Sequence, residues 1–210
     1  MFFRRKPRAV VELLIVGLGN PGAGYSATRH NVGWWVLDEL KRRLKVRNSS
    51  SRHSSQVDYA RLGGVECALI KPTTFMNLSG QSVAGWRREF PQARLLVIHD
   101  DISMAPGRCR LREEGSAGGH RGVQNIIDEL HSERFDRLKI GVGAPPDGLD
   151  AADYVLAPPD AAELQAIDAA VLAAADAVYA WARGDNDGAR RALANASGTP
   201  PVQSGNGPEK

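Results

Sequence analysis

Polar residues that could carry out catalysis follow the first apolar segment of the chain. Residues 13–17 are Leu-Leu-Ile-Val-Gly, and the glycine-rich stretch after them contains Asn20, Tyr25, His30 and Asn31. A histidine can take a proton from water near neutral pH, because its ordinary pKa is about 6.5, and an amide can donate hydrogen bonds to a reacting group. A strand that ends in such side chains predicts an active site.

Two further polar positions occur where later strands should end. Asn77 lies in the turn at 75–79, and the apolar segment 94–98 runs into a His-Asp-Asp sequence that includes Asp100. Open α/β sheets bind ligands at the carboxyl ends of their strands, so these side chains should meet. We predict that His30 and Asp100 form a base and carboxylate pair. Taken alone, His30 is better explained as a helix cap and Asp100 as a turn residue, and only the joint arrangement favours catalysis.

The chain lacks the motifs of two common hydrolytic mechanisms. It contains neither a G-x-S-x-G nucleophile elbow nor an H-E-x-x-H zinc motif. Its two cysteines, Cys67 and Cys109, have neither C-x-x-C spacing nor a nearby Cys/His set, which predicts inert thiols rather than a disulfide or a zinc site. We therefore expect direct attack by water, with no cofactor and no metal.

An alternative function comes from the segment 17–22, Gly-Leu-Gly-Asn-Pro-Gly, which matches the G-x-G-x-x-G pattern of dinucleotide-binding oxidoreductases. Pro21 lacks an amide donor and disfavours helical geometry at Asn20. The acidic residues that should bind a ribose, Asp38 and Glu39, fall inside a predicted helix. The oxidoreductase is therefore the weaker hypothesis, and a titration with NAD, NADP or FAD that gives no thermal shift would remove it.

The order of predicted elements indicates the fold. The chain has 210 residues, 42% of them hydrophobic, which is enough for one substantial core. Strands are predicted at 13–17, 59–62, 66–71, 94–101, 108–112 and 137–143, with helices at 32–44, through Trp86, through 123–130, and after Asp160. This alternation predicts an α/β fold: a single-domain three-layer sandwich with a mixed, mostly parallel, twisted sheet and helices on both faces.

Boundaries and details follow from the same patterns. We expect a basic N-terminal extension at 1–11, a catalytic domain at 12–195, a disordered tail at 196–210, and a polar loop at 47–55. The buried stripe of the last helix should contain Leu164, Ile167, Val171, Ala174, Val178 and Trp181. Residues 1–8 are too basic and too short in apolar residues for a secretory signal, and no apolar run is long enough to span a bilayer, so we expect a cytoplasmic protein, and a monomer.

Positive charge is grouped although the net charge is only +3. The groups lie at 4–8, 41–52 and 108–112. The last group alternates, so Arg108, Arg110 and Arg112 should share one face of a strand. Such a stripe favours an anionic partner, and the alternative is a solvated sheet edge protected by charge. For Arg108 alone we prefer the second explanation.

Four separated motifs occur in order along residues 12–195. The motifs are Val16-Gly-Leu-Gly-Asn-Pro-Gly with Tyr25 and Thr28-Arg-His-Asn-Val-Gly; Lys71-Pro-Thr-Thr-Phe-Met-Asn-Leu-Ser-Gly; His99-Asp-Asp with Pro106-Gly; and Gly115-Ser-Ala-Gly-Gly-His with Arg137-Leu-Lys-Ile-Gly. With these motifs the chain resembles bacterial-type peptidyl-tRNA hydrolases. Members of this family hydrolyse the ester between peptide and tRNA in peptidyl-tRNA released from ribosomes, which recycles the tRNA. The resemblance implies the same reaction here, without a metal.

The resemblance also implies roles for individual residues. His30 would activate water, and Asp100 would orient the His30 imidazole. Substrate binding would fall to Asn20, Tyr25, Met76 and Asn77, although Met76 is explained equally well as a core residue. The tRNA backbone phosphates would contact Arg110, Arg112 and Lys139, which would give affinity without reading bases.

Arg121 departs from the family, which commonly has an asparagine after the histidine at 120. Arginine is longer, carries a charge and cannot accept a hydrogen bond. It could keep the His30 imidazole neutral or reach the tRNA phosphates. The departure keeps open the alternative of a non-catalytic RNA-binding protein on the same fold, as plastid relatives serve in intron splicing.

Overall fold

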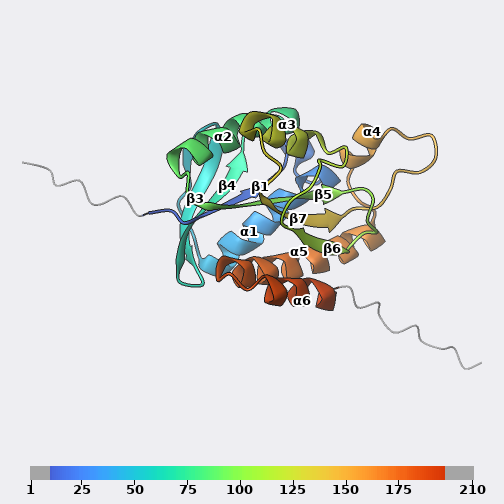
Figure 1. The fold of residues 1–210 in the computed structure, drawn as a ribbon. Coiled ribbons are helices and arrows are strands. Elements are labelled where there is room, and N and C mark those ends of the chain that lie inside the picture. The colour runs from blue at the N-terminus through green and yellow to red at the C-terminus, as the bar shows by residue number, and fades with distance from the viewer. Residues whose placement is uncertain (1–9, 197–210) are drawn as a thin grey trace, which may run out of the picture.

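A single mixed sheet forms the centre of the computed structural model, which describes residues 10–196 (Figure 1). The strands lie in the order β2-β3-β4-β1-β5-β7-β6. They are β1 Leu13–Gly17, β2 Ser50–Arg52, β3 Ser55–Leu62, β4 Val65–Pro72, β5 Arg94–Asp101, β6 Cys109–Arg112 and β7 Asp136–Gly141. The helices are α1 Val32–Leu44, α2 Ser79–Glu89, α3 Arg121–Leu130, α4 Ala151–Val155, α5 Ala161–Ala182 and α6 Asn186–Ala196, with short 3-10 turns η1 Ala23–Tyr25, η2 Arg29–Asn31 and η3 Met76–Leu78.

Helices cover both faces of the sheet. Figure 1 shows α2 and α3 on one side and α1, α5 and α6 on the other. Strand β1 alternates accordingly: Leu13 and Ile15 join the core under α1 and α5, whereas Leu14 and Val16 join the core under α2 and α3. The predicted three-layer α/β sandwich is confirmed.

Parallel pairing is confined to the four central strands. Strand β1 pairs in parallel with β4 and β5, and β5 pairs in parallel with β7. The outer pairs β2 with β3, β3 with β4, and β6 with β7 are antiparallel. The carboxyl ends of β1, β4, β5 and β7 therefore lie at one edge of the sheet, which is where the predicted polar residues follow.

Several local features differ from the predictions. The segment 47–55 is not only a loop, because β2 pairs with β3 there, and the sequence patterns missed α4 and α6. Leu164 is 39% exposed, so its place in the buried stripe of α5 was wrong. Asp160 does cap α5, in a capping box with Glu163.

The predicted extension and tail fall mainly on residues 1–9 and 197–210, outside the described residues. Within residues 10–196, no helix combines the length and apolar character that crossing a membrane requires.

The glycines after β1 allow close packing of backbone. A Cβ atom on Gly17 would lie 2.3 Å from the Gly33 carbonyl oxygen, and one on Gly33 would lie 2.4 Å from the Ile98 carbonyl oxygen. Gly19 also lies close to a side chain, the ring of Trp34. Helix α1 begins only at Val32, so the glycine turn does not open a helix as a dinucleotide-binding turn must. This geometry contradicts the oxidoreductase hypothesis.

Candidate active site

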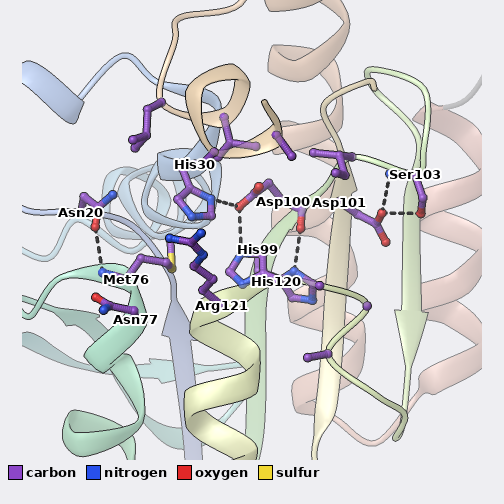
Figure 2. Close-up of a pocket in the computed structure, with 18 of the residues that line it drawn as sticks. Asn20, His30, Met76, Asn77, His99, Asp100, Asp101, Ser103, His120 and Arg121 are labelled. Atoms are coloured by element: carbon purple, nitrogen blue, oxygen red, sulfur yellow. Dashed lines mark hydrogen bonds and ion pairs between the residues drawn. The ribbon is translucent and has the colours of Figure 1, made fainter. Parts of the chain in front are cut away.

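The carboxyl-end edge of the sheet holds a cavity of about 520 Å³. The seven residues predicted for catalysis and substrate binding all line it: Asn20, Tyr25, His30, Met76, Asn77, Asp100 and Arg121. They come from the ends of β1 and β5, from η1, η2 and η3, and from the first turn of α3 (Figure 2). Ala151, Ala152 and Val155 of α4 supply apolar surface to the same cavity.

His30 and Asp100 form the predicted pair. The Nδ1 atom of His30 lies 2.8 Å from Oδ1 of Asp100, which is almost completely buried at the end of β5. A carboxylate accepts hydrogen bonds, so Nδ1 of His30 carries the proton and Nε2 keeps its lone pair. With Nδ1 bound to Asp100, it is Nε2 of His30 that a neutral imidazole would offer as a proton acceptor.

Asp100 is held in its charged form. Burial alone would raise the pKa of this carboxyl group, but its electrostatic interactions and hydrogen bonds with His30 and His120 outweigh burial and lower the pKa below its usual range. The second contact joins Nε2 of His120 to the same oxygen, Oδ1, at 3.0 Å. Asp100 therefore remains an anion that can orient and stabilise an imidazolium at His30.

His120 was missed by residue-level reasoning, which noted it only within a motif. Its Nδ1 atom accepts the backbone N–H groups of Gly122 at 3.1 Å and Val123 at 3.2 Å, so it caps the N-terminus of α3. An Nδ1 that accepts these bonds leaves the ring proton on Nε2, which donates to Asp100. A polar residue just before a predicted helix was the available signal for this cap.

By residue type, His30, Asp100 and His120 could hold a metal ion, since their ligand atoms lie within 4.8 Å of one another. A metal binds a nitrogen lone pair, but the helix cap places a proton on the Nε2 atom of His120. Coordination would require loss of both cap bonds. The cluster fits a hydrogen-bonded network better than a metal centre.

Asn20 has a fixed amide orientation. Its Oδ1 atom accepts the backbone N–H of Met76 at 2.8 Å, while its backbone N–H and C=O both bond to the side chain of Asn31. The Nδ2 group of Asn20 is left to face the cavity as a donor. The predicted residue Asn20 is thus held by Asn31, which the sequence placed among the polar residues after the first strand without indicating this supporting role.

The other cavity residues have simpler environments. Met76 is buried, and a Cβ atom on Gly122 would meet its sulfur at 2.5 Å, so η3 rests directly on α3. Asn77 is exposed at the rim of the cavity. The exposed side chain of Arg121 extends from the start of α3 into the cavity (Figure 2).

The three residues predicted to bind phosphate lie in two different environments. Arg110 and Arg112 are exposed on β6, the edge strand of the sheet. Lys139 lies opposite Arg110 on β7, but it lines the cavity and its Nζ atom bonds Oδ2 of Asp101 at 2.8 Å. Its charge is therefore offset by a carboxylate, whereas the two arginines face solvent.

Comparisons with known proteins agree on one family. The family model described as peptidyl-tRNA hydrolase matches residues 14–200. The chain is 43% identical to a peptidyl-tRNA hydrolase of Desulforamulus reducens, covering 80% of this chain and 82% of that protein. It is 41% identical to one of Syntrophomonas wolfei, covering 85% and 98%. A crystal structure of peptidyl-tRNA hydrolase from Acinetobacter baumannii matches with a TM-score of 0.81 and 30% identity, covering 90% of this chain and 97% of that one.

Proposed function

Because this chain belongs to the peptidyl-tRNA hydrolase family and hydrolyses peptidyl-tRNA, we propose that His30, oriented by Asp100, is the base that activates water in this reaction. The observation that carries the proposal is the 2.8 Å bond between His30 Nδ1 and Asp100 Oδ1, which leaves Nε2 of His30 as a proton acceptor. Both residues line the cavity at the carboxyl ends of the strands.

The reaction proceeds by direct attack on the ester carbonyl carbon. Water gives a proton to Nε2 of His30 as its oxygen bonds to that carbon, and the buried Asp100 anion stabilises the resulting imidazolium. The tetrahedral intermediate then expels the ribose oxygen, which takes the proton back from His30. The products are a tRNA with a free terminal hydroxyl group and a peptide carboxylic acid, which loses its remaining proton to solvent and becomes a carboxylate.

Amide donors stabilise the negative charge that forms on the carbonyl oxygen. The Nδ2 group of Asn20 suits this task, because its Oδ1 is already bound to the Met76 backbone and cannot exchange places with Nδ2. A fixed donor of this kind contributes roughly a hundredfold to a thousandfold in rate. Asn77, at the rim of the cavity, binds the peptide backbone. Tyr25 and Met76 line the part of the cavity that takes the peptide or the terminal adenosine.

The two strongest candidates for tRNA phosphate contacts lie outside the cavity. Arg110 and Arg112 on β6 bind backbone phosphates of the acceptor end, since both are exposed cations on an edge strand. Lys139 is the weaker candidate, because a phosphate would have to compete with Asp101 for it. Arg121 extends into the cavity as a cation with which the ester end of the substrate would make contact. All of these residues belong to the same chain, so the proposed site needs no second subunit, and we propose that the enzyme acts as a monomer in the cytoplasm, where peptidyl-tRNA arises.

Release of an N-blocked amino acid from its tRNA ester tests this mechanism. His30→Ala should lower turnover by at least about a hundredfold with the fold intact, because a positioned base contributes that much or more. His131→Asn is the matched control: it changes an exposed histidine with φ 49°, a backbone conformation that asparagine tolerates. A chelator in the assay should leave the rate of the unmodified enzyme unchanged.

Near-normal turnover by His30→Ala would disprove the assignment of the base. If neither the unmodified protein nor the variant releases the amino acid and both bind tRNA, the protein is an RNA-binding member of the fold.

A further inference from the structure

We propose that His120 is a positioning residue for hydrolysis: its Nε2–H group holds Asp100 and draws charge from the oxygen that binds His30, which lowers the basicity of His30. The inference rests on the proposed role of His30 as the base. It assigns to the N-terminal cap of α3 a function in the chemistry, in addition to its function in the fold.

The direction of the His120 hydrogen bond is fixed by the backbone. Nδ1 of His120 accepts two N–H groups, from Gly122 and Val123. A protonated Nδ1 would point its hydrogen at these donors, so the ring stays neutral and carries its proton on Nε2. The side chain is only 7% exposed, so water does not compete for this donor.

The ring of His120 is also held from two sides. Its centroid lies 4.9 Å from that of His30 and 4.7 Å from that of His99. Nδ1 of His99 donates to the Asp100 carbonyl oxygen at 2.7 Å, and burial lowers the pKa of His99 to about 3, so His99 is neutral as well. The His120 ring is therefore packed between the rings of His30 and His99, which limits how far it can turn.

A shared acceptor couples the two histidines. Oδ1 of Asp100 accepts from His30 at 2.8 Å and from His120 at 3.0 Å. A second donor on one carboxylate oxygen reduces the negative charge that an imidazolium at His30 would meet. Loss of the donor should therefore stabilise protonated His30 and raise its pKa, so that the acidic limb of the rate profile moves to higher pH.

Other titratable or charged groups face the same cavity and must be unchanged when the variants are compared with the unmodified protein. They are Asp101 of β5, Lys139 of β7, Arg121 of α3, Asp150 before α4 and Tyr25 of η1, together with His99. Asp101 and Lys139 form an ion pair with each other, and Asp150 caps α4. Substitutions at position 120 alter none of these residues.

The decisive variant is His120→Asn. Asparagine is a good N-cap, so its side-chain oxygen can still accept from the first turn of α3, but it is too short to reach Asp100 as well. His120→Ala removes both contacts and serves as the comparison. We expect His120→Asn to keep a melting temperature close to that of the unmodified protein, to lower kcat at pH 7, and to move the acidic limb of kcat/KM upward by about half a pH unit or more.

An unchanged pH profile in a folded His120→Asn protein would overturn the inference and leave His120 as a helix cap alone. Nitrogen NMR of the unmodified protein tests the same point without any variant: His120 should stay in the Nε2–H form across the pH range of the folded state. A titrating His120, or one with its proton on Nδ1, would overturn the inference. If His30→Ala retains turnover, the proposed base is wrong, and that failure is separate from either result at position 120.

Discussion

At the scale of single residues, the site depends on which atom of each polar side chain is already occupied. Asn20 shows this most clearly, because the Met76 backbone takes its oxygen and the side chain of Asn31 holds its backbone. An asparagine free to rotate by 180° would present oxygen and nitrogen to the substrate in turn. The fixed amide presents only a donor, which is what a developing oxyanion requires.

Asn20→Asp tests the donor separately from the fold. Aspartate keeps an oxygen that can accept the Met76 N–H, but it loses the Nδ2 donor and places a negative charge next to the developing one. We expect kcat to fall by at least about a hundredfold, with little change in melting temperature. Asn48→Asp, at an exposed position outside the cavity, adds the same charge and should leave kcat unchanged. Near-normal kcat in Asn20→Asp would show that Asn20 only anchors η3.

At the scale of elements, the position of His30 depends on contact between backbones. The end of β1, the start of α1 and the end of β5 meet at Gly17 and Gly33, where a Cβ atom would lie 2.3 Å and 2.4 Å from carbonyl oxygens. Backbone atoms cannot move aside as the end of a flexible side chain can. The glycines therefore bring η2, with His30, close enough to β5 for His30 to bond Asp100.

Gly33→Ala tests this contact through the free energy of unfolding, on which the substitution has two effects of opposite sign. Alanine favours a helix over glycine by roughly 1 kcal/mol, but overpacking a closed contact typically costs roughly 1–3 kcal/mol or more. With backbone on both sides, we expect overpacking to win, and denaturant titration should give a lower free energy of unfolding together with reduced turnover. Gly24→Ala is the control, since a Cβ atom there meets nothing within 4 Å. A Gly33→Ala protein more stable than the unmodified one would refute the packing argument.

At the scale of the whole molecule, positive charge is placed where a polyanion can reach it. Arg110 and Arg112 are exposed on the β6 edge, at the opposite end of the strand order from β2. Charged side chains also protect an edge strand from pairing with other chains. Phosphate binding and edge protection make different predictions about salt, because only phosphate binding releases counterions.

Arg112→Ala should weaken binding of the tRNA substrate and reduce the slope of log K against log salt by about one. The catalytic rate at saturation should change little, because Arg112 does not line the cavity. Arg61→Ala, on β3 in the other half of the sheet, removes an equal charge from another exposed arginine and should leave the slope unchanged. An unchanged slope in Arg112→Ala would assign the arginines to edge protection.

Much of the fold and site follows from local sequence. The apolar segments predict β1 and β5, the helical spacing predicts α1 from Val32 to Leu44, and Asp160 predicts the start of α5. Because parallel strands place their carboxyl ends at one edge, the polar residues that follow β1 and β5 were expected to meet, and His30 and Asp100 do so. Periodicity and strand-end chemistry are local properties, which is why the sequence alone determined them.

Only the tertiary structure decided which atoms those residues present. The orientation of the Asn20 amide depends on Met76, which is 56 positions away, and the bond between His120 and Asp100 spans 20 positions. The pairing of Lys139 with Asp101 and the exposure of Leu164 likewise depend on neighbours from distant elements. A side chain's proton, tautomer and burial are set by whatever packs against it, and local spacing carries no information about contacts that form only when the sheet is assembled.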